Sequence, residues 1–472
     1  MKKAIFLILV FNLAILKAEI RSLWVLPWNI KTPSAIDKLI EDAILYNQNE
    51  LLVEVRYRSD ALYTPNRLSN TYSNPEPRSY IMEGSNFDPL AYTLARAKEH
   101  GIRVQAWLVV FNATPLDAQH LSKNYIYQHH RDWITTDSHG RQMRSPEQYG
   151  FFLDPGIPGV QNYLLDVFSD IVVSYPDLAG IHLDYVRYPS TNFGYHPISV
   201  SRFQEAKRSQ ELSWNEWRTR QVTQFVEKLR DRLNKIKPDM ILSAAVFSNI
   251  YDARVAYAQD WFDWLNRGLI DYAYPMNYVT KYSSFSKQTE LMEDNGHTDK
   301  IVMGLRAWNA RGGSLLESAS PSYNINHIEE RIRHIRSRSF AGIALFSYEG
   351  INKGNALSHL ADRVFVDSEP LEPLASPLPA ADVHLSVIDQ VFGLDFVVPI
   401  EGRWHWELLN EQDAVVYSRF RYYTKGNNHD EFEGTLANGE KIPAGTYLLS
   451  LYMPGTEHKY LIPISFGALH LE

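Results

Sequence analysis

The chain contains no cysteine among its 472 residues, which excludes disulfide bonds, thiolate metal sites and a cysteine nucleophile. Its 16 histidines show no His-Glu-x-x-His or similar ligand spacing, so we expect no metal and no cofactor. It also lacks a Gly-x-Gly-x-x-Gly loop, a phosphate loop and a Gly-x-Ser-x-Gly elbow. The usual signatures of dinucleotide binding, phosphoryl transfer and serine hydrolysis are therefore missing.

An excess of positive charge is missing too. Lys and Arg total 47 against 55 Asp and Glu, which gives a net charge of −8. A nucleic-acid groove needs basic surface, so we expect no nucleic-acid partner. Hydrophobic residues make up 45% of the chain and aromatic residues 13%, enough to bury a full core. The length favours a large catalytic domain followed by a smaller one.

The apolar run near the N-terminus is too short for a stable membrane span. Lys2 and Lys3 precede the apolar residues 4–16, and Ala18 offers a small residue for cleavage. This pattern predicts a signal peptide over residues 1–18, with an uncleaved anchor as the alternative. We therefore expect the mature protein to be exported, either to the periplasm or into the medium.

Strand and helix patterns alternate from residue 21 to about residue 365. The expected strands cover residues 21–27, 51–55, 103–109, 180–184, 240–247, 270–274, 301–305 and 342–346. Eight strands separated by helices predict a (β/α)8 TIM barrel over residues 19–367. A doubly wound open sheet is the alternative, and the missing glycine-rich nucleotide loop argues against it.

The fourth expected strand ends on a carboxylate. Period-2 alternation places His182 and Asp184 on one face, which a barrel strand would turn toward its interior and mouth. Asp184 is the last strand residue, the position where α/β barrels carry their chemistry. It is followed at once by the aromatic and cationic loop of residues 185–189. An ion pair with Arg187 or Arg56 is the structural alternative for Asp184.

The other expected strand ends are also polar or aromatic. The candidate substrate-binding residues are Arg56, Trp107, Asn112, Tyr185, Arg187, Tyr188, Asn277, Tyr278, Arg306, Trp308 and Tyr348. Aromatic faces stack on the C–H surface of a sugar, while amides and charged groups hydrogen-bond its hydroxyls. The carboxyl ends of the strands are therefore typical of a carbohydrate cleft.

Several of these segments, taken in order, resemble the bacterial glycosyl hydrolase-like family ten. They are Arg21-Ser22-Leu23-Trp24, Glu54-Val55-Arg56, Gln105-Ala106-Trp107-Leu108, Arg131-Asp132-Trp133, residues 153–158, residues 180–189 and Pro275-Met276-Asn277-Tyr278. The resemblance covers about residues 20 to 365. It implies a TIM barrel, export and hydrolysis of glycosidic bonds, with some relatives acting on the glycan strands of peptidoglycan.

Glycoside hydrolysis generally needs two carboxyl groups, one protonated and one ionised. Asp184 is the first candidate, and Glu349, just past the eighth strand, is the second, with an exposed loop acid as its alternative. Glu54 is the third candidate, because strand parity turns Glu54 into the barrel and Arg56 to its mouth. Arg56, His182 or Arg306 could pair with Glu54 for structure alone. Peptidoglycan-cleaving relatives often have two adjacent acids after the fourth strand, where this chain has Asp184 and then a tyrosine.

We therefore expect an exported glycoside hydrolase acting on a polysaccharide or a peptidoglycan glycan strand. A non-catalytic glycan-binding envelope protein on the same scaffold is the alternative. The two differ in whether a second carboxyl group lies across the cleft from Asp184.

A second domain is expected after the barrel. Four prolines between residues 368 and 380 predict a stiff linker, and short alternating segments over residues 381–472 predict a β-sandwich of fibronectin or immunoglobulin type. Trp404 and Trp406 could bind carbohydrate there, but their alternation favours aromatic core residues.

Overall fold

The computed structural model describes residues 18–115, 118–144, 150–310, 312–316, 323–367, 383–388, 391–398, 401–410, 415–432, 441–443, 445–452 and 459–466. All of the expected signal peptide except Ala18, and the whole expected linker at residues 368–380, lie outside the described residues.

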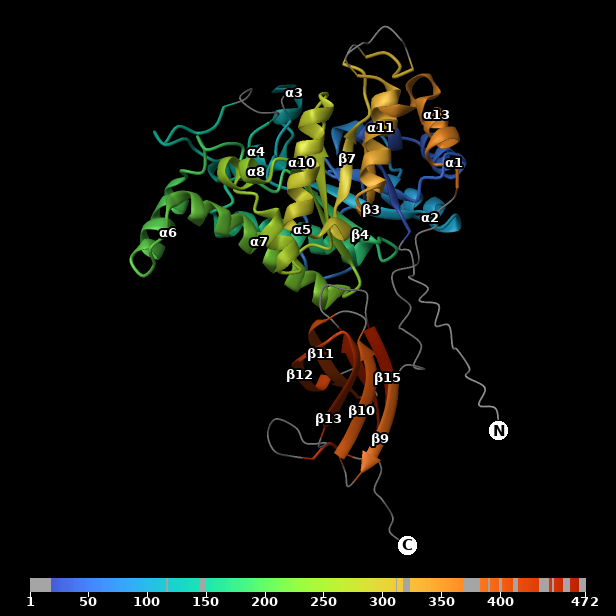
Figure 1. The fold of residues 1–472 in the computed structure, drawn as a ribbon. Coiled ribbons are helices and arrows are strands. Elements are labelled where there is room, and N and C mark those ends of the chain that lie inside the picture. The colour runs from blue at the N-terminus through green and yellow to red at the C-terminus, as the bar shows by residue number, and fades with distance from the viewer. Residues whose placement is uncertain are drawn as a thin grey trace, which may run out of the picture.

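Eight parallel strands close into a barrel in chain order, which confirms the predicted (β/α)8 fold (Figure 1). The strands are β1 (Ile20–Val25), β2 (Glu50–Arg56), β3 (Arg103–Val109), β4 (Gly180–Asp184), β5 (Ile241–Phe247), β6 (Tyr272–Asn277), β7 (Val302–Arg306) and β8 (Gly342–Phe346). Because all eight run the same way, their carboxyl ends meet at one end of the barrel. Asp184 at the end of β4 therefore lies at the end of the barrel where α/β barrels carry their chemistry.

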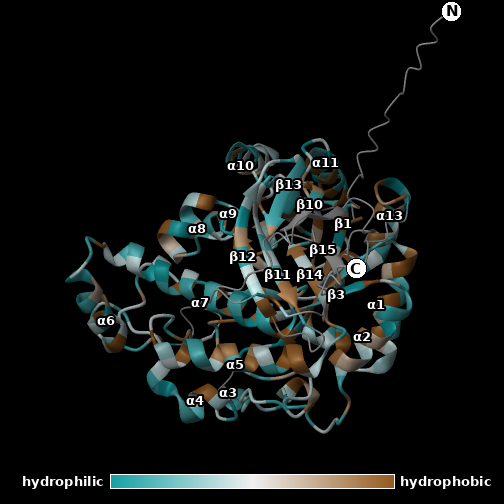
Figure 2. Ribbon diagram, turned by 90° about the horizontal axis from the view of Figure 1, so that it is seen from below, coloured by the Kyte–Doolittle hydropathy of each residue, from teal (hydrophilic) through white to brown (hydrophobic). Residues whose placement is uncertain are grey.

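Helices surround the strands, as the view from below shows (Figure 2). The longer ones are α1 (Pro33–Leu45), α2 (Pro89–Glu99), α5 (Pro158–Ser174), α6 (Pro197–Lys207), α7 (Trp214–Ile236), α10 (Tyr282–Asn295) and α11 (Ile325–Arg336). Shorter ones are α3 (Ala118–Leu121), α4 (Tyr125–His129), α8 (Ile250–Tyr257), α9 (Trp261–Asn266), α12 (Tyr348–Asn352) and α13 (Ala356–Arg363), with 3-10 turns η1 (Pro27–Ile30), η2 (Tyr80–Met82), η3 (Arg131–Trp133), η4 (Thr298–Lys300) and η5 (Lys353–Asn355).

Local sequence explains where the first helices begin. Pro33 opens α1 and Pro89 opens α2, where a missing backbone N–H costs no helical hydrogen bond. The side chains of Thr32 and Asp88 cap these helices by accepting from backbone N–H groups of the first turn. The apolar faces of the helices then pack on the outward side chains of the strands in one continuous core.

The sixth strand extends further than the sequence predicts. We expected residues 270–274, whereas β6 runs from Tyr272 through Pro275 to Asn277. Pro275 has no N–H for the ladder, and the pairing of β6 with β7 is correspondingly limited to Met276 and Asn277. β6 pairs with β7 beyond the proline, at Met276 and Asn277. The sequence pattern did not predict this, because a proline usually ends a strand.

The second strand contains an irregularity that reverses the orientation expected for Arg56. Glu54 pairs with Trp107, but the next paired residue of β2 is Arg56, so Val55 is an extra residue at a β-bulge. Arg56 is fully buried in the outer layer, with its guanidinium carbon 5.6 Å from the ring centre of Phe168. The prediction that Arg56 points to the barrel mouth is therefore wrong.

A chain of hydrogen bonds crosses the barrel interior beneath the site. Trp24 Nε1 donates to His182 Nε2 at 3.1 Å, so this nitrogen must accept and the proton lies on Nδ1, 2.8 Å from Ser243 Oγ. Ser243 donates to Gln105 Oε1 at 2.8 Å, and Gln105 Nε2 donates to Glu50 at 2.9 Å. Burial lowers the pKa of His182 to about 3, which keeps the imidazole neutral. His182 is thus a residue of the barrel core.

The C-terminal strands form two antiparallel sheets (Figure 1), which confirms the expected sandwich. One sheet has the order β13-β10-β9 and the other β12-β11-β14-β15. The strands are β9 (Val383–Ile388), β10 (Val391–Val398), β11 (Gly402–Leu409), β12 (Val415–Tyr423), β13 (Gly426–Phe432), β14 (Gly445–Tyr452) and β15 (Lys459–Phe466). Trp404 and Trp406 are buried among residues of both sheets, so they are core residues, as the sequence favoured.

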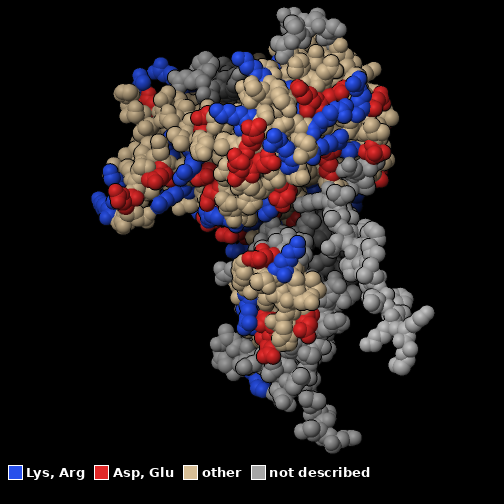
Figure 3. Space-filling view, viewed as in Figure 1, with Lys and Arg blue, Asp and Glu red and all other residues tan. Residues whose placement is uncertain are grey.

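Charges of both signs are interspersed over the barrel face drawn in Figure 3. Within the described residues no helix is long and apolar enough to cross a membrane.

Candidate active site

Asp184, the last residue of β4, carries a largely buried carboxyl group. Trp107 Nε1 donates to its Oδ2 at 3.1 Å, and the backbone N–H of Tyr185 donates to its Oδ1 at 2.7 Å. Burial raises the pKa of Asp184 to about 6, although these hydrogen bonds and the charge of Arg187 act in the opposite direction. A carboxyl group with this pKa exchanges its proton near neutral pH, as an acid/base catalyst must.

The arginine expected to pair with Asp184 is held by aromatic rings instead. The guanidinium carbon of Arg187 lies 4.8 Å from the ring centres of both Tyr185 and Phe247 and 5.3 Å from that of Tyr257. No salt bridge joins Arg187 to Asp184 within the described part of the chain. Arg187 therefore acts on Asp184 through its electrostatic field, and the carboxylate stays free of an ion pair.

Glu54, on β2, supplies a second buried carboxyl group, close enough to Asp184 for the charge of Asp184 to act on it. Burial raises the pKa of Glu54 well above its usual range, and the negative charge of Asp184 raises it further, against the opposing charge of Arg58. Among the described residues nothing hydrogen-bonds to the Glu54 carboxyl group, so its ionised form is poorly stabilised. Two neighbouring carboxyl groups whose environments separate their pKa values are suited to the roles of acid and base.

Glu349 lies at the rim of the barrel. Its side chain is 43% exposed, its Oε2 accepts from Trp28 Nε1 at 2.9 Å, and Lys353 Nζ lies 4.0 Å from Oε1. Glu54 is only 4% exposed and is therefore far better shielded from water than Glu349, which reverses the order in which we rank these two candidates. Helix α12 carries Glu349 outward from the end of β8.

Aromatic rings line the end of the barrel around Phe346. Its ring centre lies 5.9 Å from Trp24, 6.2 Å from Trp107, 5.5 Å from Tyr278 and 5.8 Å from Trp308. These rings come from β1, β3 and the ends of β6, β7 and β8. Trp24 and Trp107 are buried core rings, whereas Tyr278, Trp308 and Phe346 are half-buried and offer partly exposed aromatic faces on which a sugar could stack.

Three predicted substrate-binding residues come together on this side. Burial raises the pKa of Tyr278 well above its usual range and the charge of Asp184 adds to it, so the phenol lies near that carboxyl group. The ring centres of Tyr278 and Trp308 are 5.3 Å apart, and the Arg306 guanidinium carbon lies 4.7 Å from the Trp308 ring. The half-buried Trp308 therefore presents an aromatic surface with a cation behind it.

Four predicted binding residues do not fit a cleft. Arg56 Nη2 is paired with Glu76 Oε1 at 2.6 Å, and both side chains are fully buried. Tyr348 donates to Asp42 on α1 at 2.7 Å, because α12 turns it away from the barrel mouth. Tyr188 and Asn112 are also fully buried, so a sugar cannot reach them.

Asn277, at the end of β6, is 1% exposed, and both polar atoms of its amide lack a partner among the described residues. Its hydrogen-bonding capacity is therefore unfilled, and burial of such a group is costly.

Sequence reasoning missed Trp28, Tyr57, Arg58 and Phe346. The last three lie at the carboxyl ends of strands, the position by which we chose the other candidates. Phe346 ends β8, and Tyr57 and Arg58 follow β2 directly. Trp28 follows β1 in the same way, at the start of η1. A search for aromatic and cationic residues at or just after the end of each strand would have identified all four.

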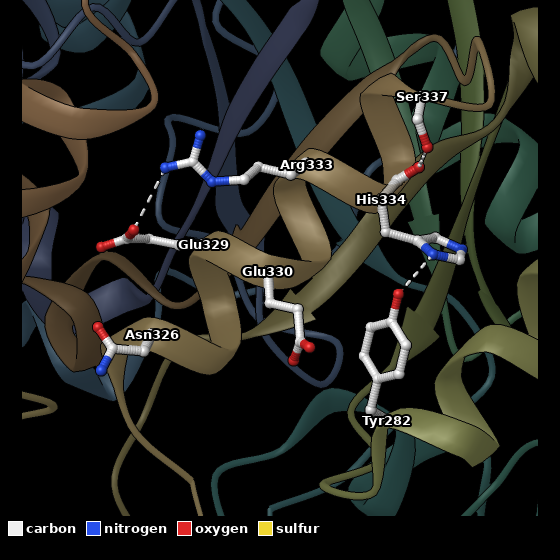
Figure 4. A pocket seen from close by; sticks show the side chains of 7 residues that line it. All are labelled: Tyr282, Asn326, Glu329, Glu330, Arg333, His334 and Ser337. Atoms are coloured by element: carbon white, nitrogen blue, oxygen red, sulfur yellow. Dashed lines mark hydrogen bonds and ion pairs between the residues drawn. The ribbon is translucent and has the colours of Figure 1, made fainter.

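No group of three or more His, Asp or Glu side chains within the described ranges could hold a metal ion. A surface pocket between α10 and α11 is lined by Tyr282, Asn326, Glu329, Glu330, Arg333, His334 and Ser337 (Figure 4). Its side chains come from the outer helices and pair with one another, as in Glu329 with Arg333 at 3.5 Å. It is separate from the strand ends that carry Asp184 and Glu54.

Comparisons with known proteins agree with this architecture. The sequence profile of the family described as "Glycosyl hydrolase-like 10" matches residues 18–305. The proteins called glycosyl hydrolase DigH from Escherichia coli O6:H1 and from Escherichia coli K12 are each 28% identical to the chain over 227 residues. These matches cover 42% of this chain and 48% of each relative, so the chain spans about half the length of these curated relatives.

Among solved structures, the glycoside hydrolase domain of PgaB (BpsB) from Bordetella bronchiseptica aligns with a TM-score of 0.54 at 15% identity. The alignment covers 73% of this chain and 98% of that chain. At this identity the likeness shows the shared barrel fold alone.

Proposed function

The chain belongs to the glycosyl hydrolase-like 10 family, and from this premise we propose that it is a glycoside hydrolase. The substrate is a polysaccharide or a peptidoglycan glycan strand, and the reaction is hydrolysis of its O-glycosidic bonds. The observation that carries the proposal is the pair of buried carboxyl groups, Asp184 and Glu54, on β4 and β2 at one end of the barrel. Burial and the negative charge of Asp184 raise the pKa of Glu54, so the pair favours a state in which Glu54 is protonated and Asp184 is ionised.

Glu54 is the general acid in this proposal. Burial, together with the charge of Asp184, raises the pKa of Glu54 and so favours its protonated form, which can donate a proton to the leaving glycosidic oxygen. Asp184, with a pKa of about 6, is ionised above that pH and acts as the nucleophile or as the base that activates water. The hydrogen bonds from Trp107 and Tyr185 fix the orientation of the Asp184 carboxylate.

The surroundings of the pair supply the sugar recognition. Tyr278, Trp308 and Phe346 offer aromatic faces for the C–H surface of a pyranose ring, and the guanidinium of Arg306, beside Trp308, offers donors to its oxygens. Such a mixed lining suits an uncharged or weakly acidic glycan better than a purely ionic ligand.

The direct test is incubation of the purified protein with peptidoglycan glycan strands and with a panel of plant and algal polysaccharides. We expect new reducing ends and shorter glycans, identified by mass spectrometry of the products. Binding of a glycan without any product from the wild-type protein would overturn hydrolysis and favour the glycan-binding envelope protein. The feature that favours the glycan-binding function is the sequence Asp184-Tyr185, which stands in place of two adjacent acids.

Export is part of the same proposal, because a glycan polymer of the envelope lies outside the cytoplasm. The support is the pattern of Lys2 and Lys3 followed by apolar residues 4–16. Sequencing the N-terminus of the mature protein should find a start near residue 19, and a retained Met1 would contradict cleavage.

A further inference from the structure

Trp28 is the one exposed tryptophan among the eleven in the chain, all of which lie in the described residues. Its side chain is 46% exposed, whereas the other ten are buried or half-buried. It lies in η1, directly after β1, and so at the same end of the barrel as the carboxyl groups of Asp184 and Glu54. An exposed aromatic ring alone proves nothing, because single apolar side chains are common on protein surfaces.

The orientation of this ring is fixed by a carboxylate. Trp28 Nε1 donates to Glu349 Oε2 at 2.9 Å, which joins the segment after β1 to the segment after β8. Both partners are exposed to solvent, so the hydrogen bond contributes little to the stability of the fold. Its effect is to hold the polar edge of the indole and to leave the rest of the ring in water.

Tyr57 packs against the Trp28 ring on the side of β2, the strand that carries Glu54. The ring centres of Trp28 and Tyr57 lie 6.4 Å apart in an edge-to-face arrangement, and the guanidinium carbon of Arg58 lies 4.6 Å from the Tyr57 ring. Burial raises the pKa of the Tyr57 phenol, and the negative charge of Glu54 contributes in the same direction. Tyr57 thus packs against the exposed indole and follows Glu54 by three residues at the end of β2.

We propose that Trp28 and Tyr57 form a further sugar-binding subsite, where the indole face stacks on a pyranose unit beyond those held at Asp184 and Glu54. Glu349 is a positioning residue that fixes the indole. The ligand is an extended glycan with an apolar C–H ring face, long enough to reach from Glu54 past Tyr57 to Trp28. This subsite rests on the proposed function, since it assumes that the glycan bound at Asp184 and Glu54 extends towards Trp28.

The test compares chain lengths. β-1,4-linked oligosaccharides of glucose, mannose and N-acetylglucosamine, with two and with six units, are titrated calorimetrically into the wild-type protein and into Trp28→Ala. We expect Trp28→Ala to bind the six-unit oligosaccharides about tenfold more weakly and the two-unit ones unchanged. Leu45→Ala is the matched control: Leu45 is 66% exposed but ends α1, at the opposite end of the barrel. It should bind every oligosaccharide as the wild type does.

The positioning role has its own readout. Glu349→Ala should weaken six-unit binding in the same direction as Trp28→Ala, whereas Glu349→Gln keeps an acceptor oxygen and should retain most of the affinity. Adding Glu349→Ala to Trp28→Ala should cause no further loss, because the carboxylate acts only through the indole. If Glu349→Ala binds six-unit oligosaccharides with full affinity, Glu349 does not position the indole for binding.

Failure of the subsite and failure of the proposed function are distinguishable. If the wild type cleaves a glycan and Trp28→Ala keeps full affinity and kcat/KM for six units, the subsite is wrong and hydrolysis stands. If binding depends on chain length through Trp28 but no glycan is cleaved, hydrolysis is wrong and the subsite stands. No binding of any six-unit oligosaccharide by the wild type would overturn the subsite.

Discussion

Trp107 donates its indole N–H to Oδ2 of Asp184 over 3.1 Å, and on its other side the same residue is paired in register with Glu54. Strand β3 lies between β2 and β4 in the barrel, so one tryptophan stands between the strands that carry the two carboxyl groups. Trp107 therefore orients the carboxyl group of the proposed base and neighbours the proposed acid on the adjacent strand, and each carboxyl group can be tested separately.

Replacement of the proposed base is the most direct experiment. Asp184→Asn keeps the size of the side chain but removes its charge, so turnover should fall by about two to four orders of magnitude. Glycan binding should survive, since the rings and arginines are unchanged. Turnover and thermal unfolding are measured on one preparation, and a stable, fully active Asp184→Asn protein would refute the assignment.

Replacement of the proposed acid should depend on the leaving group. Glu54→Gln cannot donate a proton, so hydrolysis of natural glycans should fall about a hundredfold or more. An aryl glycoside whose phenolate leaves without protonation should be cleaved far better by this variant, and Asp184→Asn should show no such recovery. Equal losses on both substrate types would mean that Glu54 is not the acid.

The stability of the protein should depend on pH through Asp184. The folded-state pKa of about 6 lies above the usual 3.8, so the folded protein keeps its proton while the unfolded chain loses it. This contribution is fully present below about pH 4 and is lost as the pH rises to about 6, by about 3 kcal/mol in total. Denaturant unfolding across this window should show a smaller fall for Asp184→Asn than for the wild type.

The hydrogen bond from Trp107 should tune the pH profile of catalysis. Trp107→Phe keeps an aromatic ring but removes the donor, and the lost hydrogen bond should raise the pKa of Asp184. The acidic limb of kcat/KM should therefore move to higher pH, by up to about one unit. An unchanged limb would indicate that this hydrogen bond has no influence on the ionised form.

The barrel should fold without the C-terminal sheets. Among the residues whose burial the structure describes, the barrel core includes Phe365, the sandwich core includes Leu394, and the two cores share no residue. A protein ending at Asp367 should keep a cooperative thermal transition and its activity on small soluble substrates. Aggregation of that protein would show that the C-terminal sheets complete the barrel.

Local patterns were sufficient for the fold. Runs of apolar residues at strand spacing, separated by amphipathic segments with Pro and capping residues at their starts, are short-range signals, and they predicted the barrel and the sandwich. They also placed Asp184 at the end of β4, because a strand end is marked by a change of composition within a few residues.

The sequence by itself thus determined the strand ends and the kinds of side chain gathered there. Tertiary structure alone decided which of them meet. A single bulged residue in β2 separated Arg56 from the face of Glu54 and turned it into the outer layer, although parity had placed both on one face. Glu349 was joined to Trp28, 321 positions away, and Tyr348 to Asp42, 306 positions away. Such pairings depend on the register and closure of the whole barrel. No local pattern of residues can specify a contact between side chains that lie so far apart in the chain.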